Sequence, residues 1–139
     1  MAKIKIDGLD KLQKALKDNV TLDEVKELVH RHGSQMHRKM QSNANFKGHY
    51  EWVAGKGKVF KKPTGTTKRS IFLDIEDEGF SATVGPGETP LNPKTGLPST
   101  EYSPYLEYGT RYMAAQPFIR PAFEEQKEKF KRAMQRLVK

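Results

Sequence analysis

The first half of the chain contains one long amphipathic pattern. Apolar residues recur at intervals of three, four or seven, as on one face of a helix: Leu22, Val25, Val29, Met36 and Met40. Thr21 and, three residues later, Glu24 form a capping box, which is typical of the first turn of a helix. Gly33 lies inside this pattern and is expected to weaken the helix by up to about 1 kcal/mol relative to alanine. We predict a helix of about 20 residues whose apolar face, including both methionines, packs in the core.

Alternating patterns predict strands on either side of this helix. Every second residue is apolar around the turn Asp77-Glu78-Gly79: Ile71, Leu73 and Ile75 before it, and Phe80, Ala82 and Val84 after it. This alternation predicts a β-hairpin. Residues 3–6 alternate Lys and Ile over a strand-like length, and Asp7 is placed to cap a short helix with Leu9, Leu12 and Leu16 on one face.

The stretch from Tyr102 to Phe123 concentrates aromatic residues and prolines. Pro104 favours an extended chain, so we predict a strand over Tyr105–Tyr108 that joins the same sheet and ends at the turn Gly109-Thr110. Pro117 and Pro121 are typical of the first residues of a helix. From Pro121 onward one helical face is apolar, formed by Phe123, Phe130, Met134 and Leu137.

The remaining segments are predicted to be two long flexible loops, at residues 46–70 and 85–101. The first is rich in lysine and glycine, although its apolar residues could form a loose hairpin over Ala54–Lys58; the second is rich in proline. The length of 139 residues predicts a single domain over residues 1–139. Because only 35% of the residues are hydrophobic and 30% are charged, we expect an elongated or partly unfolded monomer. We predict an α+β fold in which a small antiparallel sheet of three to four strands packs against two long helices.

Positive charge is concentrated in the 46–70 loop. The formal net charge of the chain is +8, and in this loop seven basic residues against one acid give +6. Six basic residues are candidates for contact with a polyanion or a partner protein: Lys56, Lys58, Lys61, Lys62, Lys68 and Arg69. Because Tyr50, Trp52 and Phe60 lie among them, one interpretation is a nucleic-acid-binding module that uses charge for phosphates and rings for stacking. The other interpretation is a solvated loop.

The sequence predicts no enzyme, no cofactor and no metal site. The chain has no cysteine, which excludes disulfides and thiol chemistry. His30, His32 and His37 lie on the predicted helix, but no two are three or four residues apart, as paired metal ligands on a helix would be. The acidic cluster of Asp74, Glu76, Asp77 and Glu78 is interpreted as a solvated turn, with a hydrolytic site as a distant alternative.

The aromatic stretch carries a resemblance to a known family. Tyr102-x-x-Tyr-Leu-Glu-Tyr-Gly-Thr110, followed by Ala115-Gln-Pro-Phe-Ile-Arg-Pro-Ala-Phe-Glu124, resembles the signature of the tail-completion, or head–tail joining, proteins of lambda-like tailed bacteriophages. A second segment, from Pro63 to Ile71, is similar to the Pro-x-x-Thr-Gly-x-Leu-x-x-Ser-Ile segment of that family, although it is shorter and has no counterpart of the leucine.

The resemblance implies a structural protein of the siphophage neck. It implies self-association into a sixfold ring, with the head connector and the tail tube as partners and DNA in the channel as a further candidate. We expect the protein in the host cytoplasm before assembly and in the virion afterwards. No apolar run approaches the roughly 20 residues that span a bilayer, so we expect no membrane partner. We also expect no small-molecule partner.

The same stretch supplies the candidates for a subunit or partner interface, which combine aromatic rings with polar and charged neighbours. They are Tyr105, Glu107, Tyr108, Thr110, Arg111, Phe118 and Arg120. An aromatic centre with an arginine edge has the composition of a binding hot spot. Two structural alternatives remain open: the rings fill the core between sheet and helix, or Arg120 forms an ion pair with Glu107 that holds the strand to the start of the last helix.

Overall fold

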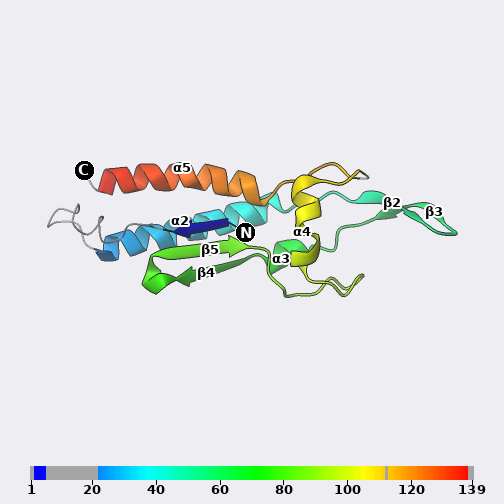
Figure 1. The fold of residues 1–139 in the computed structure, drawn as a ribbon, viewed down its shortest axis with the longest axis horizontal. Coiled ribbons are helices and arrows are strands. Elements are labelled where there is room, and N and C mark those ends of the chain that lie inside the picture. The colour runs from blue at the N-terminus through cyan, green and yellow to red at the C-terminus, as the bar shows by residue number, and fades with distance from the viewer. Residues whose placement is uncertain (1, 6–21, 112, 138–139) are drawn as a thin grey trace.

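Three antiparallel strands and two long helices form the body of the molecule. The computed structural model describes residues 2–5, 22–111 and 113–137. Strands β1 (Ala2–Lys5), β5 (Ser81–Gly85) and β4 (Phe72–Glu76) form a sheet in the order β1-β5-β4. Helices α2 (Leu22–Asn43) and α5 (Ile119–Leu137) run beside each other along this sheet (Figure 1). The predicted α+β fold is confirmed, with three strands and two long helices. The short helix and the Thr21 cap predicted within residues 7–21 lie outside the described residues.

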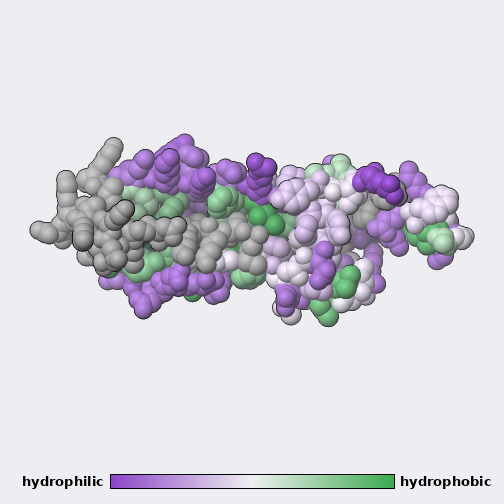
Figure 2. Space-filling view, in the orientation of Figure 1, coloured by the Kyte–Doolittle hydropathy of each residue, from purple (hydrophilic) through white to green (hydrophobic). Residues whose placement is uncertain are grey.

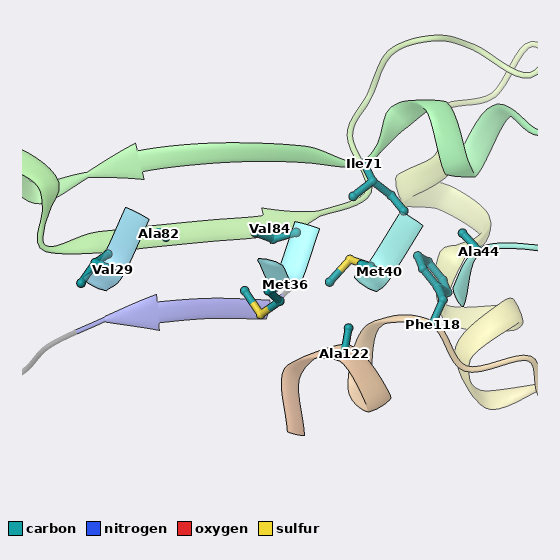
Figure 3. Packing of buried hydrophobic residues seen from close by; sticks show 9 residues of the cluster. All are labelled: Val29, Met36, Met40, Ala44, Ile71, Ala82, Val84, Phe118 and Ala122. Carbon is teal, nitrogen blue, oxygen red and sulfur yellow. The ribbon is translucent and has the colours of Figure 1, made fainter. Parts of the chain in front are cut away.

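The hydrophobic core lies where α2, β5 and the start of α5 meet (Figure 3). Met36 and Met40 are fully buried, as the helical pattern predicts, and so are Val84 and Phe118. All five residues of the central strand β5 are buried. In Figure 3 the cluster continues from Val29 at one end to Phe118 at the other, so one apolar layer joins the helices to the sheet.

Gly33 has a packing reason to lie inside α2. A methyl group on its Cα would lie 2.8 Å from the Cβ of Ala82 and 3.2 Å from Cδ1 of Leu73. The missing side chain lets the helix backbone approach β5 closely. The residue that weakens the helix in isolation therefore allows the helix to pack on the sheet.

The β-hairpin predicted around Asp77–Gly79 is present. Strand β4 pairs with β5 through Leu73 opposite Val84 and Ile75 opposite Ala82, and the turn is a short 3-10 segment, η1 (Asp77–Gly79). Strand β1 pairs with the other edge of β5, with Ile4 opposite Ala82.

The 46–70 segment contains more regular structure than the predicted long loop. Strands β2 (His49–Val53) and β3 (Gly57–Lys61) form the hairpin that the apolar residues suggested, and a short helix, α3 (Thr66–Ser70), follows. The second predicted loop, 85–101, is irregular up to Pro98. Its last residues begin helix α4 (Ser99–Tyr108).

The prediction of a strand at Tyr105–Tyr108 is wrong, because these residues form the second half of α4. Pro104 led to the error, since a proline inside a helix removes one backbone hydrogen bond. Hydrogen bonds of residues on either side of Pro104 stabilise the helix. The Ser103 hydroxyl donates to the Ser99 carbonyl (2.5 Å), and Gln116 N–H donates to the Leu106 carbonyl (2.7 Å). The chain does turn at Gly109, as predicted, but a helix rather than a strand ends there: Gly109 has a φ of 78° and donates its N–H to the Tyr105 carbonyl (2.8 Å).

Candidate interaction surfaces

A two-stranded hairpin projects from one end of the elongated molecule (Figure 1). We call residues 49–61, which comprise β2, β3 and their turn, the arm. Among the described strands, β2 and β3 pair only with each other. Such a hairpin is marginally stable in water unless it packs against something else.

The arm is held to the body at its base. The ring of Phe46, just before β2, meets the edge of the buried Phe118 ring with centroids 5.2 Å apart. The backbone N–H of Lys47 donates to Oε1 of Gln116 (2.7 Å). Core packing and one hydrogen bond therefore fix where the arm leaves the body.

One face of the arm carries exposed aromatic rings and a lysine. Alternation along paired strands places Tyr50 opposite Phe60, and Trp52 opposite Lys58, on the same face. The Tyr50 and Phe60 ring centroids are 5.1 Å apart, and the Lys58 ammonium lies 5.1 Å from the Tyr50 ring centroid. The exposed fraction is 54% for Tyr50, 81% for Trp52 and 47% for Phe60. Figure 2 shows hydrophobic and hydrophilic residues side by side at this end of the molecule.

A groove of about 910 Å³ lies between the arm and the segment that precedes α5. Tyr50, Trp52 and Lys58 line one side of it, and residues 113–117 line the other. Asparagines from the end of α2 and just beyond it, Asn43 and Asn45, also contribute. The sequence did not indicate this groove, because its two sides are more than 50 residues apart in the chain.

The basic residues predicted as a polyanion site separate into two groups. The first group lies along the arm and at its base and consists of Lys56, Lys58, Lys61 and Lys62. Lys68 and Arg69 lie on α3, where they make local hydrogen bonds: the Lys68 ammonium donates to Oδ1 of Asn45 (3.0 Å), and Arg69 donates to the Thr64 carbonyl (3.2 Å). Only the first group belongs to the projecting surface.

The predicted aromatic interface is also divided. Tyr105 and Tyr108 are exposed on α4, by 59% and 79%, whereas Phe118 is completely buried. Phe118 therefore belongs to the core, and the two tyrosines form a separate exposed patch. Thr110 and Arg111 are exposed just after α4, and the backbone of Thr110 pairs with that of Met113 (2.8 and 3.3 Å).

Glu107 caps the last helix. Its carboxylate accepts hydrogen bonds from three successive backbone N–H groups at the start of α5, those of Phe118 (2.9 Å), Ile119 (3.1 Å) and Arg120 (2.8 Å). These groups have no partner within the helix, and a negative charge is favourable at a helix N-terminus. Glu107 thus contacts Arg120 through the backbone amide, which differs from the predicted side-chain ion pair. Glu107 thus acts as a structural residue that joins α4 to α5.

An acidic turn lies toward the other end of the molecule. Asp74 on β4 and Asp77 and Glu78 on η1 are exposed, whereas Glu76 is half-buried and accepts a hydrogen bond from the Thr83 hydroxyl (3.3 Å). Lys26 of α2 is close to this turn, with its ammonium 5.1 Å from the Phe80 ring centroid. Exposure of the acids agrees with the interpretation of a solvated turn.

The helical histidines make separate contacts. His32 is buried between α2 and α5, where the Gln126 side chain donates to its Nδ1 and also to Oε1 of Gln35 (2.9 Å). Burial lowers the pKa of His32, and the positive charges of Arg31 and Lys129 lower it further. The His37 ring donates to the Ile71 carbonyl (3.0 Å). In residues 22–111 and 113–137, together with 2–5, no group of three or more potential ligands is arranged to hold a metal ion.

Comparison with known proteins found no match for this chain to a family model, a curated protein or a solved structure. Within the described part of the chain, no helix is long and apolar enough to cross a membrane.

Proposed function

We propose that this chain is a structural assembly protein of a tailed bacteriophage, which completes the tail and joins it to the head connector as part of a ring. In this proposal the protein is made in the host cytoplasm and becomes part of the virion neck. Its partners are other copies of itself, the head connector and the tail tube. The resemblance of residues 102–124 to tail-completion proteins supports this function and implies a sixfold ring.

The observation that carries the proposal is the exposed aromatic face of the arm. Aromatic side chains bury roughly 150–250 Å² each in contacts, so three rings at the exposures given above leave on the order of 400 Å² of ring surface in water. An exposed apolar patch of this size is comparable to the largest one on a typical monomer, and such patches are often functional. A projecting hairpin that needs further packing suits a subunit whose structure is completed by its neighbours.

The exposed tyrosines of α4 add a second surface. Tyr105 and Tyr108 lie on a different element from the arm, so one subunit offers two unlike patches. A subunit with unlike surfaces can bind its neighbours head to tail, and such contacts close into a ring when the rotation between subunits permits. This arrangement supports a ring rather than a simple twofold dimer.

The proposal is tested by disrupting the gene in the phage that carries it. Electron microscopy of the lysate should then show filled heads and separate tails that do not join. Wild-type protein should restore joining, and the Trp52→Ser variant should not. Leu91→Ser is the matched control, because Leu91 is 54% exposed on the 85–98 loop and its loss removes a similar exposed apolar group. Joined particles in the absence of the gene would contradict the proposal.

A basic nucleic-acid-binding module is the second candidate function. It is favoured by the position of Lys58 over the Tyr50 ring, since lysines and rings on one face could contact phosphates and bases together. If the arm binds DNA, the logarithm of the binding constant falls linearly with the logarithm of salt concentration. Replacing Lys56 and Lys58 by alanine should then reduce the slope by about 2. Absence of binding to duplex DNA at low salt rules this candidate out.

A further inference from the structure

The arm of this protein is positively charged where it is most exposed. Lys56 is exposed in the turn of the arm, and Lys58 is exposed on the same face as Trp52. Glu51 is the single acid of the arm. A partner that covers this face must therefore bring negative charge as well as surface for the rings.

The acidic turn of the same chain has the complementary charge. Asp74, Asp77 and Glu78 are exposed there within a stretch of five residues. Two exposed acids of the long helices are paired with basic residues: Glu125 lies 3.0 Å from Lys129 and 3.6 Å from Lys39, and Glu27 lies 2.9 Å from Arg31. The acids of the β4–β5 turn differ from these, because no basic residue lies among residues 71–81.

The two surfaces cannot meet within one molecule. The arm projects from one end of the body, and the turn between β4 and β5 lies toward the other (Figure 1). Contact between them requires a second copy of the chain.

We propose that the arm of one copy docks on the acidic β4–β5 turn of a second copy, head to tail. This inference rests on the proposed ring function and names the contact that would build the ring. Lys56 and Lys58 face the three exposed acids of the neighbour's turn, and the rings of Tyr50, Trp52 and Phe60 cover the turn. Each copy gives one arm and receives another, so the contact repeats around a closed ring or along a filament.

The size of the surface predicts a weak single contact. About 400 Å² of exposed ring surface is half of the roughly 800 Å² per partner that is usual for stable complexes. Two isolated copies should therefore separate readily. In a ring, or on a tail end that holds several copies, the effective local concentration is high and the same contact is stable.

Charge reversal tests this contact. The arm variant K56E/K58E and the turn variant D74K/E78K each place like charges in the contact, so each alone should associate at least about tenfold more weakly than wild type. Mixed together, the two variants are complementary at both surfaces, because an acidic arm meets a basic turn and a basic arm meets an acidic turn. The equimolar mixture should recover association close to that of wild type.

Sedimentation equilibrium over a concentration series measures these effects, at about 50 mM and about 500 mM salt because exposed charges are screened at the higher value. The control is K127E/K131E, which reverses two exposed lysines on α5 and changes the net charge as much as the arm variant does. It should associate as wild type does. Thermal unfolding of every variant checks that the fold is intact.

Three results would overturn the contact. The first is association of the wild type that neither reversal weakens, or that the mixture does not restore. The second is a wild type that stays monomeric up to about 1 mM at low salt, the concentration at which a contact of about 4 kcal/mol is half formed. The third is loss of duplex DNA binding in K56E/K58E with self-association unchanged, which would assign the arm to nucleic acid. The gene disruption described above decides the proposed function separately.

Discussion

Replacing Gly33 by alanine distinguishes helix propensity from packing. Propensity alone predicts that Gly33→Ala stabilises α2 by about 1 kcal/mol. The structure predicts the opposite sign. The new methyl group would lie 2.8 Å from Cβ of Ala82, whereas carbon atoms in contact are normally about 3.5–4.0 Å apart. Since both atoms are attached directly to backbone, α2 and β5 must separate by roughly 1 Å.

The cost of this separation exceeds the gain in propensity. Val29, Met36 and Ala82 are completely buried in the same layer, and a gap of about 0.5–1 Å forfeits a quarter to a half of the attraction at each contact. Overpacked cores typically lose about 1–3 kcal/mol. After subtraction of the propensity term, we expect Gly33→Ala to be about 1 kcal/mol less stable than wild type.

A double-mutant cycle with Ala82→Gly isolates the contact. Ala82→Gly alone removes a buried methyl group and weakens the strand, which together cost about 1.5 kcal/mol. In Gly33→Ala/Ala82→Gly the new methyl occupies the space of the old one, so the double variant should be about 1–2 kcal/mol more stable than the sum of the single changes. Urea unfolding followed by circular dichroism gives the four free energies of unfolding. The exposed Ser42→Ala on the same helix controls for propensity.

A Gly33→Ala protein more stable than wild type would refute the packing argument. So would additive effects of the two substitutions, because additivity means that the two positions do not interact.

Three further outcomes follow from the site and the core. Glu107→Gln should lower the free energy of unfolding by about 1 kcal/mol and Glu107→Ala by about 2 kcal/mol, since the cap of α5 is weakened or lost; urea unfolding measures both. Because the pKa of His32 is lowered in the folded protein, the unfolded chain binds a proton at this residue more readily than the folded one. The contribution of neutral His32 to stability is therefore present above pH 6.5 and is lost as the pH falls below that value. Thermal unfolding of wild type and His32→Gln over this pH range should show a steeper loss in the wild type. Phe118→Ala should cost about 3–5 kcal/mol, because it empties a fully buried site, whereas Tyr108→Ala, which is mostly exposed, should change unfolding by less than about 0.5 kcal/mol.

The elements with a long or regular apolar pattern could be predicted from the sequence. Helix α2 and the β4–β5 hairpin have several apolar residues at one spacing, and each extra residue at that spacing strengthens the assignment. Helix α4 could not be predicted, because Pro104 contradicts a helix locally and the groups that hold α4, such as Gln116, come from later in the chain. Tertiary contacts outweigh local propensity there.

The candidate surfaces were predicted in part. The lysines and rings of the arm were recognised as one group because they are close in the sequence. Residues whose role depends on distant partners were assigned less well: Phe118 lies in the core, and Glu107 binds the backbone of residues 118–120. The composition of residues 102–123 does not show which of its rings is buried. It also does not show that a carboxylate caps a helix that begins 11 or more positions later in the chain.

The narrow attachment of the arm has a mechanical consequence. Five-residue strands extend about 17 Å, and the contacts of Phe46 and Lys47 lie at the base. A rotation of about 10° at that base displaces the tip by about 3 Å, which is close to the rise of one strand residue. Small adjustments at the rings of Phe46 and Phe118 can therefore move Trp52 by about this distance without any rearrangement of the sheet and helices behind it.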